Sequence, residues 1–281
     1  MNNTKFIEDM VEQYGPQLPI DQLVLEINRL YHGFEAEIYD AKHPEIYEQL
    51  PGIWREMSKR VTEYFGSKTL RILDFGCGTG FEAQQLLQNI PTSSIGALTC
   101  YDPSPEMLEK CRRTITPLFP SATFFSSLEE VLNSDASYSL LVTNSVLHHL
   151  PDVLLTIGSL LPFLDTHAIW LAGHEPSLRF YKNTECVENF EAYLRERRRL
   201  PDYYTQLLKL IIRVKGNPYP YAKTAREAVR TGLFARQPPS VVIDRIVDFH
   251  VAHSTEEVSA GRGFDVFAMQ EDFQASWKLI W

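Results

Sequence analysis

The sequence predicts an α/β fold: a doubly wound, mostly parallel seven-stranded sheet, with a helical N-terminal leader and a helical insertion between strands five and six. Two observations predict it. From residue 70 to about 174, short apolar segments alternate with helical ones, the rhythm of parallel strands joined by crossover helices. A glycine-rich turn at residues 76–80 then joins the first predicted strand to the first of these helices, as in nucleotide-binding folds.

The glycine turn is the centre of the predicted site. Residues 71–75 predict a short buried strand, residues 81–90 predict a helix, and Gly76, Gly78 and Gly80 lie between them. Glycine permits a positive φ and lets a ligand approach the backbone closely. The first amides of a helix have no intrahelical partner and can meet a ligand's polar groups. The turn therefore predicts a nucleoside-cofactor site; the plainer interpretation is a tight turn without a ligand.

The spacing of the glycines distinguishes between cofactors. A dinucleotide fingerprint requires a third glycine at position 81, where this chain has Phe81. The segment Asp-Phe-Gly-Cys-Gly-Thr-Gly at residues 74–80 instead resembles motif I of the class I S-adenosylmethionine (SAM)-dependent methyltransferases, of the small-molecule type found in quinone and natural-product biosynthesis. The resemblance implies that Asp74 orients the cofactor's amino group. It also implies that the loop of Gly76, Cys77, Gly78 and Gly80 passes under the methionine part of SAM.

The second predicted strand, residues 95–101, ends at Asp102, 22 positions after Gly80 (102 − 80). Nucleotide-binding folds place their ribose acid at about this distance, and a carboxylate can accept hydrogen bonds from both ribose hydroxyls. Residues 101–108 also resemble the family's second motif, which implies that Asp102 binds the ribose and that Pro103 and Met107 lie near the adenine. The plainer interpretation of Asp102 is a helix N-cap.

Two further segments are candidates for cofactor contacts. The third predicted strand, residues 122–125, leads into Ser126, Ser127 and Leu128, where the resembled family usually has an aspartate that binds the adenine amino group. A serine hydroxyl or the backbone would make that contact here. In the leader, the segment around Tyr39 resembles the tyrosine-containing leader that folds over the cofactor in small-molecule methyltransferases; the alternative is that this ring only packs against the core.

The fourth predicted strand, residues 138–143, runs into residues 144–152, which resemble the segment after strand four in small-molecule methyltransferases. Residues at the carboxyl ends of parallel strands face the ligand, so Asn144 should lie beside the sulfonium. Ser145 and Val146, which follow it, are further candidates for cofactor contacts. His148 and His149 follow, and a neutral imidazole can act as a general base. The alternative is that these histidines cap and pack a helix.

The fifth predicted strand, residues 167–173, ends at His174 and Glu175, on the same edge of the sheet as the cofactor site. Both are further candidates for acid–base catalysis on the acceptor side. A turn built around Glu175 and the proline after it is the plainer interpretation.

The predicted organisation has three parts. Residues 1–69 form a helical leader or lid, residues 70–177 and 241–281 form the cofactor-binding core, and residues 178–240 form an insertion that covers the acceptor site. The last two strands are predicted at residues 241–251 and 263–269, as the hairpin that closes the sheet in the resembled family.

Composition narrows the range of partners. A net charge of −9 argues against general nucleic-acid binding, which requires a positive surface. The 4 cysteines show no Cys-x-x-Cys spacing, so no metal site is predicted. The start lacks the apolar region of a secretory signal, and the longest apolar stretch, residues 153–164, is too short to span a bilayer. We expect a soluble cytoplasmic protein without membrane or nucleic-acid partners, as a monomer or a homodimer.

These features together predict an enzyme that transfers a methyl group from SAM to a small-molecule acceptor and releases S-adenosylhomocysteine. Catalysis would come mainly from positioning and desolvation, with a histidine as the candidate base. One alternative is a SAM-binding protein that catalyses a non-methylating reaction such as a cyclisation. A nicotinamide-dependent oxidoreductase is a second alternative, against which Phe81 counts. A methyltransferase acting on protein or RNA is a third, and the acidic charge disfavours it.

Overall fold

The computed structural model describes residues 4–134, 136–198 and 220–248. The chain divides into two compact units. One unit is residues 29–175, and the other combines residues 1–28 with residues from 176 onward. Helix α2 (Ile20–Glu35) passes from one unit into the other.

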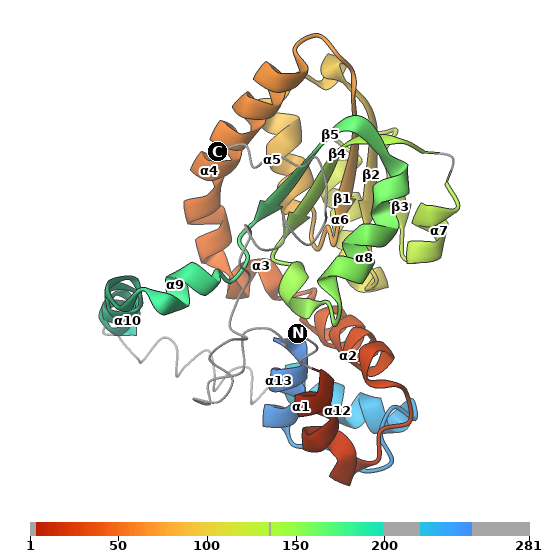
Figure 1. Ribbon diagram of the computed structural model, residues 1–281, viewed down its shortest axis with the longest axis vertical. Helices are drawn as coiled ribbons and strands as arrows, with labels where there is room; N and C mark the ends of the chain where they lie inside the picture. The colour runs from red at the N-terminus through yellow and green to blue at the C-terminus, as the bar shows by residue number, and fades with distance from the viewer. Residues whose placement is uncertain (1–3, 135, 199–219, 249–281) are drawn as a thin grey trace. The chain divides into compact units, whose positions relative to one another are not determined.

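The unit of residues 29–175 contains a sheet of five parallel strands in the order β3-β2-β1-β4-β5, which confirms the first five predicted strands (Figure 1). The strands are β1 (Leu70–Phe75), β2 (Ile95–Tyr101), β3 (Thr123–Phe125), β4 (Tyr138–Asn144) and β5 (Leu164–Gly173). The helices are α3 (Tyr39–Lys42), α4 (Pro44–Phe65), α5 (Phe81–Asn89), α6 (Pro105–Ile115), α7 (Leu128–Leu132) and α8 (Val153–Leu160). The strand order reverses between β1 and β4, and ligands of open α/β sheets bind outside the carboxyl ends of the strands at such a point.

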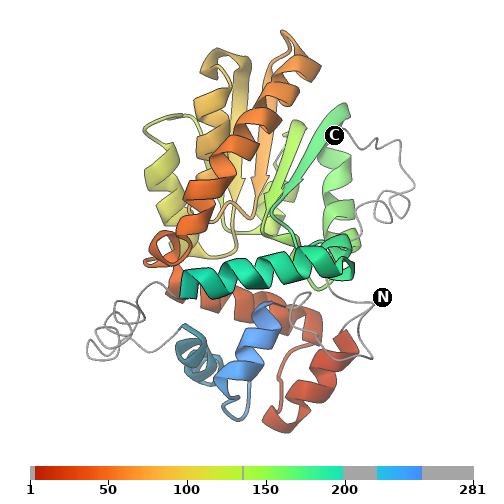
Figure 2. The same cartoon turned by 90° about the vertical axis from the view of Figure 1, so that its left-hand side faces the viewer.

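One face of this sheet supports α4, α5 and α6. Alternate residues of the strands, including Ile72, Leu98 and Leu140, are buried in one apolar cluster with residues of these three helices. The period of two follows from the pleat, which sends successive side chains to opposite faces. Figure 2 looks onto this face with α4 in front of the strands, whereas α8 lies on the opposite side of the sheet (Figure 1).

Helix α4 (Pro44–Phe65), in the predicted helical leader, contains Pro51 in its interior. A proline inside a helix costs about 3 kcal/mol. Ile46, Leu50 and Trp54 nevertheless continue one buried face through it at a spacing of four residues. Burial of this face outweighs the local cost, and Pro44 at the start suits the first turn of a helix.

The other unit joins the start of the chain to a segment more than 200 residues later. Its elements are α1 (Thr4–Val11), η1 (Glu12–Tyr14), α9 (Leu178–Lys182), α10 (Thr184–Arg198), α12 (Pro220–Arg230) and α13 (Ser240–Val247). Pro16 forms an antiparallel bridge with Phe234, and the Ala235 amide donates to the Gly15 carbonyl at 3.0 Å. Nothing in the sequence predicts this pairing.

The predicted strand at residues 241–251 is wrong, because residues 240–247 form helix α13. Val242, Ile243, Ile246 and Val247 are buried, whereas Val241 is 56% exposed, which is a helical period. The β-branched residues favour a strand by propensity, but the buried face decides the structure. The last predicted strand, residues 263–269, lies outside the described residues. Within the described ranges, no helix has the length and apolarity needed to cross a membrane.

Candidate active site

The glycine turn follows β1 at the switch point of the sheet. Gly76 has φ +78°, and a Cβ there would lie 2.4 Å from Val146 Cγ2, so a side chain cannot fit between the ends of β1 and β4. At Gly80 a Cβ would lie 3.1 Å from Cys111 Sγ, against α6. Gly78 differs: its φ is +51°, but no atom lies within 4 Å of the Cβ position. The space above Gly78 is therefore open for a ligand.

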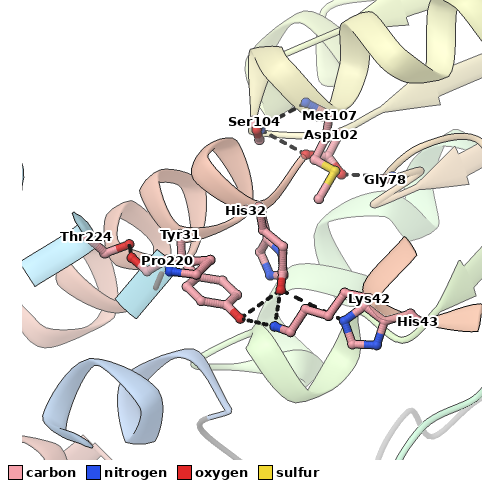
Figure 3. Close-up of polar contacts among 11 residues, drawn as sticks. Tyr31, His32, Lys42, His43, Gly78, Asp102, Ser104, Met107, Pro220 and Thr224 are labelled. Carbon is pink, nitrogen blue, oxygen red and sulfur yellow. Dashed lines mark hydrogen bonds and ion pairs between the residues drawn. The ribbon is translucent and has the colours of Figure 1, made fainter. Parts of the chain in front are cut away.

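Asp102 lies at the end of β2 and bonds directly to the glycine turn (Figure 3). Its Oδ2 accepts from the Gly78 amide at 2.9 Å, and its Oδ1 accepts from the Ser104 amide at 2.9 Å. Burial raises the pKa of Asp102 to about 6, although both amides work in the opposite direction. The N-cap of α6 is Ser104, whose hydroxyl accepts from the buried Met107 amide at 3.3 Å. The plainer interpretation of Asp102 as the N-cap is therefore wrong.

Two more buried carboxyl groups lie beside the turn. Asp74, at the end of β1, is 1% exposed, and its Oδ2 has no hydrogen-bond partner among the described residues. Glu82, in the first turn of α5, accepts from Asn144 Nδ2 at 2.5 Å. Burial raises the pKa of Glu82 to about 8, and burial together with the charge of Glu82 raises the pKa of Asp74 well above its usual range. A nearby positive charge favours the ionised form of a buried carboxyl group, so a cationic ligand would offset the cost of ionising Asp74 and Glu82.

Asn144 closes the same site from the end of β4. Its amide nitrogen is used by Glu82, but its Oδ1 is buried without a partner among the described residues. An unmade hydrogen bond of a buried group costs about 1–3 kcal/mol. The unpartnered oxygens of Asn144 and Asp74 therefore favour a ligand that donates hydrogen bonds.

Glu175 fixes the segment after β4. Its Oε1 accepts from the amides of Val146 at 2.6 Å and Leu147 at 2.9 Å, and its Oε2 lies 2.9 Å from His148 Nδ1. The side chains of His148 and Glu175 are 11% and 10% exposed. A carboxylate at Nδ1 favours the tautomer with the proton on that nitrogen and leaves Nε2 as the proton acceptor. The contact fixes the orientation of the His148 ring, and its role as a general base stays a prediction.

Ser145 and His174 end the adjacent strands β4 and β5, and both have a positive φ, of 57° and 52°. They are the only non-glycine residues with a positive φ in the described parts of the chain. Ser145 Oγ lies 3.2 Å from His174 Nδ1, and the Ser145 amide donates to the Gly173 carbonyl at 3.0 Å. Such strain costs about 1–3 kcal/mol per residue and clusters at functional sites.

Comparison with known proteins matches the region that holds most of these groups, from Asp74 to His149. The sequence profile of a family described as a methyltransferase domain matches residues 72–159, from β1 into α8. Residues 72–159 are therefore similar in sequence to a methyltransferase domain. Helix α10 and the rest of the unit that combines residues 1–28 with residues from 176 onward lie outside the matched region.

Two curated relatives are similar to parts of the chain. A malonyl-[acyl-carrier protein] O-methyltransferase of Halalkalibacterium halodurans is 25% identical over 147 residues, 48% of this chain and 53% of that protein. Malonyl-[acyl-carrier protein] O-methyltransferase 1 of Ilyobacter polytropus is 26% identical over 123 residues, 43% of this chain and 44% of that protein. The chain thus spans about half the length of these relatives. The solved plantazolicin methyltransferase BpumL, in complex with SAH and a monoazolic analogue, is 16% identical, with 63% and 65% coverage and a TM-score of 0.42.

The leader contacts the glycine turn of the methyltransferase domain. Asp40 Oδ1 accepts from the Tyr47 hydroxyl at 2.6 Å and from the Thr79 hydroxyl at 2.9 Å, and Thr79 belongs to the turn. Burial and the Glu82 carboxyl group raise the pKa of Tyr39. The structure therefore brings Tyr39 close to the buried carboxyl groups. Its predicted contact with a cofactor stays a prediction.

Glu35, at the end of α2, is the centre of a polar cluster that the sequence does not reveal. Figure 3 labels its neighbours Tyr31, His32, Lys42 and His43. The Tyr31 hydroxyl donates to it at 3.0 Å, Lys42 is ion-paired with it, and His32 Nδ1 and His43 Nε2 lie 3.7 and 3.9 Å away. Burial works to raise the pKa of Glu35, but the neighbouring His32, His43 and Lys42 side chains outweigh it and hold the pKa well below its usual range. The carboxylate therefore stays ionised.

His32 joins this cluster to the segment after β4. Its ring centroid lies 4.8 Å from that of His149, which lies 3.9 Å from that of His148. The three rings form a row from the leader to the methyltransferase domain. His149 therefore has ring neighbours on both sides, which favours packing as its role.

Ser127, after β3, has a local structural role. Ser127 caps α7: its hydroxyl accepts from the Glu129 amide at 3.2 Å, and its own amide donates to Glu130 at 3.1 Å. The Asp102 amide donates to the Phe125 carbonyl at 3.2 Å, so this strand end adjoins the end of β2. Contacts of Ser126, Ser127, Leu128 or the half-buried Pro103 with an adenine stay predictions.

Proposed function

We propose that the protein transfers a methyl group from SAM to a small-molecule acceptor. The observation that supports it best is the set of buried carboxyl groups of Asp74, Glu82 and Asp102 around a glycine turn in a methyltransferase domain. SAM is a cation at its ammonium and sulfonium groups, and buried carboxylates attract it. A nicotinamide dinucleotide would bring its anionic diphosphate to the same turn, where these groups repel it. The charge of the site thus favours SAM over the nicotinamide cofactors.

Four residues of the site, Asp102, Asp74, Asn144 and Gly78, have an assignable role toward SAM. Each Asp102 oxygen accepts one backbone amide and keeps acceptor capacity for a ribose hydroxyl. Asp74 Oδ2 and Asn144 Oδ1, which have no partners among the described residues, are the acceptors for the ammonium group. Gly78 leaves the space that the cofactor needs.

When bound, SAM supplies an electrophilic methyl group. The protein's contribution is to align the acceptor with it and to exclude water, which is worth several kcal/mol. Where the acceptor must lose a proton, His148 Nε2 accepts it, and Glu175 stabilises the resulting imidazolium through Nδ1. Ser145 and His174 line the ends of the neighbouring strands on the same edge of the sheet.

The names of the two curated relatives suggest which class of methyl acceptor to test first. Both curated relatives are named for a malonyl group on an acyl-carrier protein. A carboxylic acid, free or attached to a carrier protein, is therefore the first acceptor class to test. A carboxylate needs no base, so His148 would then bind or orient the acceptor.

The deciding experiment uses SAM with a labelled methyl group. Binding is first measured by calorimetry, and the saturated protein is then incubated with malonyl-acyl-carrier protein and with a small-molecule cell extract. We expect label in an acceptor and formation of S-adenosylhomocysteine. Label that stays entirely on SAM would contradict methyl transfer and favour a non-methylating reaction such as a cyclisation. Failure to bind SAM would contradict both.

A further inference from the structure

Three cysteines that lie far apart in the sequence meet under the glycine turn. Cys77 belongs to the turn, Cys100 to β2 and Cys111 to α6, and all three are fully buried. Their Sγ atoms lie within 4.8 Å of one another. We call this group the three-cysteine cluster. The sequence has no Cys-x-x-Cys spacing that predicts this cluster, because the fold and not a local motif brings the thiols together.

Each thiol of the three-cysteine cluster is held by a separate rigid element. The Cys77 amide donates to the Tyr101 carbonyl at 2.9 Å, and the Gly80 amide donates to the Cys77 carbonyl at 2.8 Å. The missing side chain at Gly80 leaves room for Cys111, whose Sγ lies 3.1 Å from the Cβ position of that glycine. Cys100 pairs with Asp74 in the β1–β2 ladder. The cluster is therefore preorganised before any ion binds.

The geometry suits a metal ion bound by three sulfur atoms. A zinc–thiolate bond is about 2.3 Å long, so a planar three-coordinate ion with bonds of this length places its sulfur ligands about 4.0 Å apart. The Sγ atoms of the cluster lie at most 4.8 Å apart. A separation of about 4.0 Å therefore requires each Sγ–Sγ distance to shorten by less than about 1 Å. Sulfur ligands select soft ions over Mg²⁺ and Ca²⁺.

The charge distinguishes divalent from monovalent ions. A complex of three thiolates with a divalent ion has a net charge of −1. The same complex with a monovalent ion has a net charge of −2. Burying the larger net charge costs more. We propose that Cys77, Cys100 and Cys111 form a binding site for a soft divalent metal ion, and the probe that tests it is Cd²⁺.

Cd²⁺ binding to the reduced full-length protein is followed without oxygen by the ultraviolet absorbance of the cadmium–thiolate bond. We expect one equivalent to bind. Cys77→Ala, Cys100→Ala and Cys111→Ala should each weaken binding by more than about tenfold. Cys186→Ala is the matched control, because Cys186 is exposed on α10, outside the cluster, and this variant should bind Cd²⁺ unchanged. Unchanged affinity in any cluster variant, or its loss in Cys186→Ala, would overturn the proposal.

A measurement on the unmodified protein guards against variants that misfold. The cadmium NMR shift reports the ligand atoms directly. A shift typical of three thiolates supports the site, whereas a shift typical of nitrogen and oxygen ligands, or no bound cadmium, overturns it. Neither readout depends on methyl transfer, so the metal site and the proposed function can fail separately.

Discussion

Glu175 Oε2 lies 2.9 Å from His148 Nδ1, while the other oxygen of the same carboxylate accepts from two consecutive backbone amides. One side chain at the end of β5 thus fixes both the path of the chain after β4 and the orientation of an imidazole. A carboxylate in this position also stabilises the charged ring after it has accepted a proton. The relationship makes Glu175 a positioning residue for His148.

Glu175→Gln tests this relationship. The glutamine can still accept from the backbone amides, but its NH₂ group toward Nδ1 favours the tautomer with the proton on Nε2, which then cannot accept one. For an acceptor that must lose a proton, turnover should fall by about 10²–10⁴-fold with SAM affinity within about twofold of the original. Labelled-methyl transfer and calorimetry measure the two quantities.

The matched variant for Glu175→Gln is His148→Ala. It should show a similar loss of turnover, and the double variant should lose no more than the larger single loss, because both changes disable one unit. Full turnover in Glu175→Gln would show that Glu175 only shapes the loop.

Asp102→Asn tests the ribose assignment. The asparagine keeps one acceptor oxygen but loses the charge, and a hydrogen bond to a charged group is worth about 1.5–3 kcal/mol, so SAM affinity should fall at least about tenfold. Ser104→Ala is the control: it removes the cap of α6 and costs about 1 kcal/mol of stability without touching the carboxylate. Equal SAM affinity in both variants, measured by calorimetry, would refute the assignment.

The buried carboxyl groups predict opposite effects of pH on stability and on SAM binding. Burial raises the pKa of Glu82 from 4.5 to about 8, so between these values the folded protein holds a proton that the unfolded chain releases. Stability without SAM should therefore fall as the pH rises from 6 to 8, by at most about 1.4 kcal/mol per pH unit. SAM affinity should rise over the same range, because the cation binds to the ionised site.

Thermal unfolding at pH 6 and pH 8, with and without SAM, measures both effects. Glu82→Gln is the matched variant, since its amide oxygen can still accept from Asn144 but does not titrate. The pH dependence should be smaller in that variant. An unchanged dependence would assign it to other groups, of which Asp102, with a pKa of about 6, is the next candidate.

The site was partly predictable from the sequence because its cofactor half is local. The glycine turn follows a strand with a recognisable apolar pattern, and Asp102 follows it at a characteristic distance. The ion-paired Glu35 and the three-cysteine cluster were not predictable. Lys42 reaches Glu35 from α3, and the three cysteines come from the glycine turn, β2 and α6, so only the packing of separate elements brings these partners together.

The error in the fold has a specific physical cause. Residues 241–247 are rich in β-branched side chains, which favour a strand, yet their buried positions follow a helical period. Short apolar runs are ambiguous in this way, and tertiary packing decides them. The bridge between Pro16 and Phe234 depends on contacts across most of the chain, for which the sequence has no local signal.

Two of the glycines of the turn, Gly76 and Gly78, should respond to alanine in different ways. At Gly76 the new methyl group would lie 2.4 Å from Val146, a stiff side chain, and φ is +78°. Gly76→Ala should therefore lower the free energy of unfolding by more than the roughly 1–2 kcal/mol of the backbone strain alone. In Gly76→Ala/Val146→Ala the clash is relieved, and the coupling energy from denaturant unfolding should be about 1–3 kcal/mol.

At Gly78 the same change meets no atom within 4 Å, so Gly78→Ala should cost only the strain of its positive φ, about 1–2 kcal/mol. Its methyl group would instead occupy the space assigned to the cofactor, so SAM affinity should fall at least about tenfold in a protein that remains folded. Calorimetry and denaturant unfolding on the same preparation separate the two effects. Normal SAM affinity in Gly78→Ala would place the cofactor elsewhere on the sheet edge, because a ligand against the turn cannot tolerate the added methyl group.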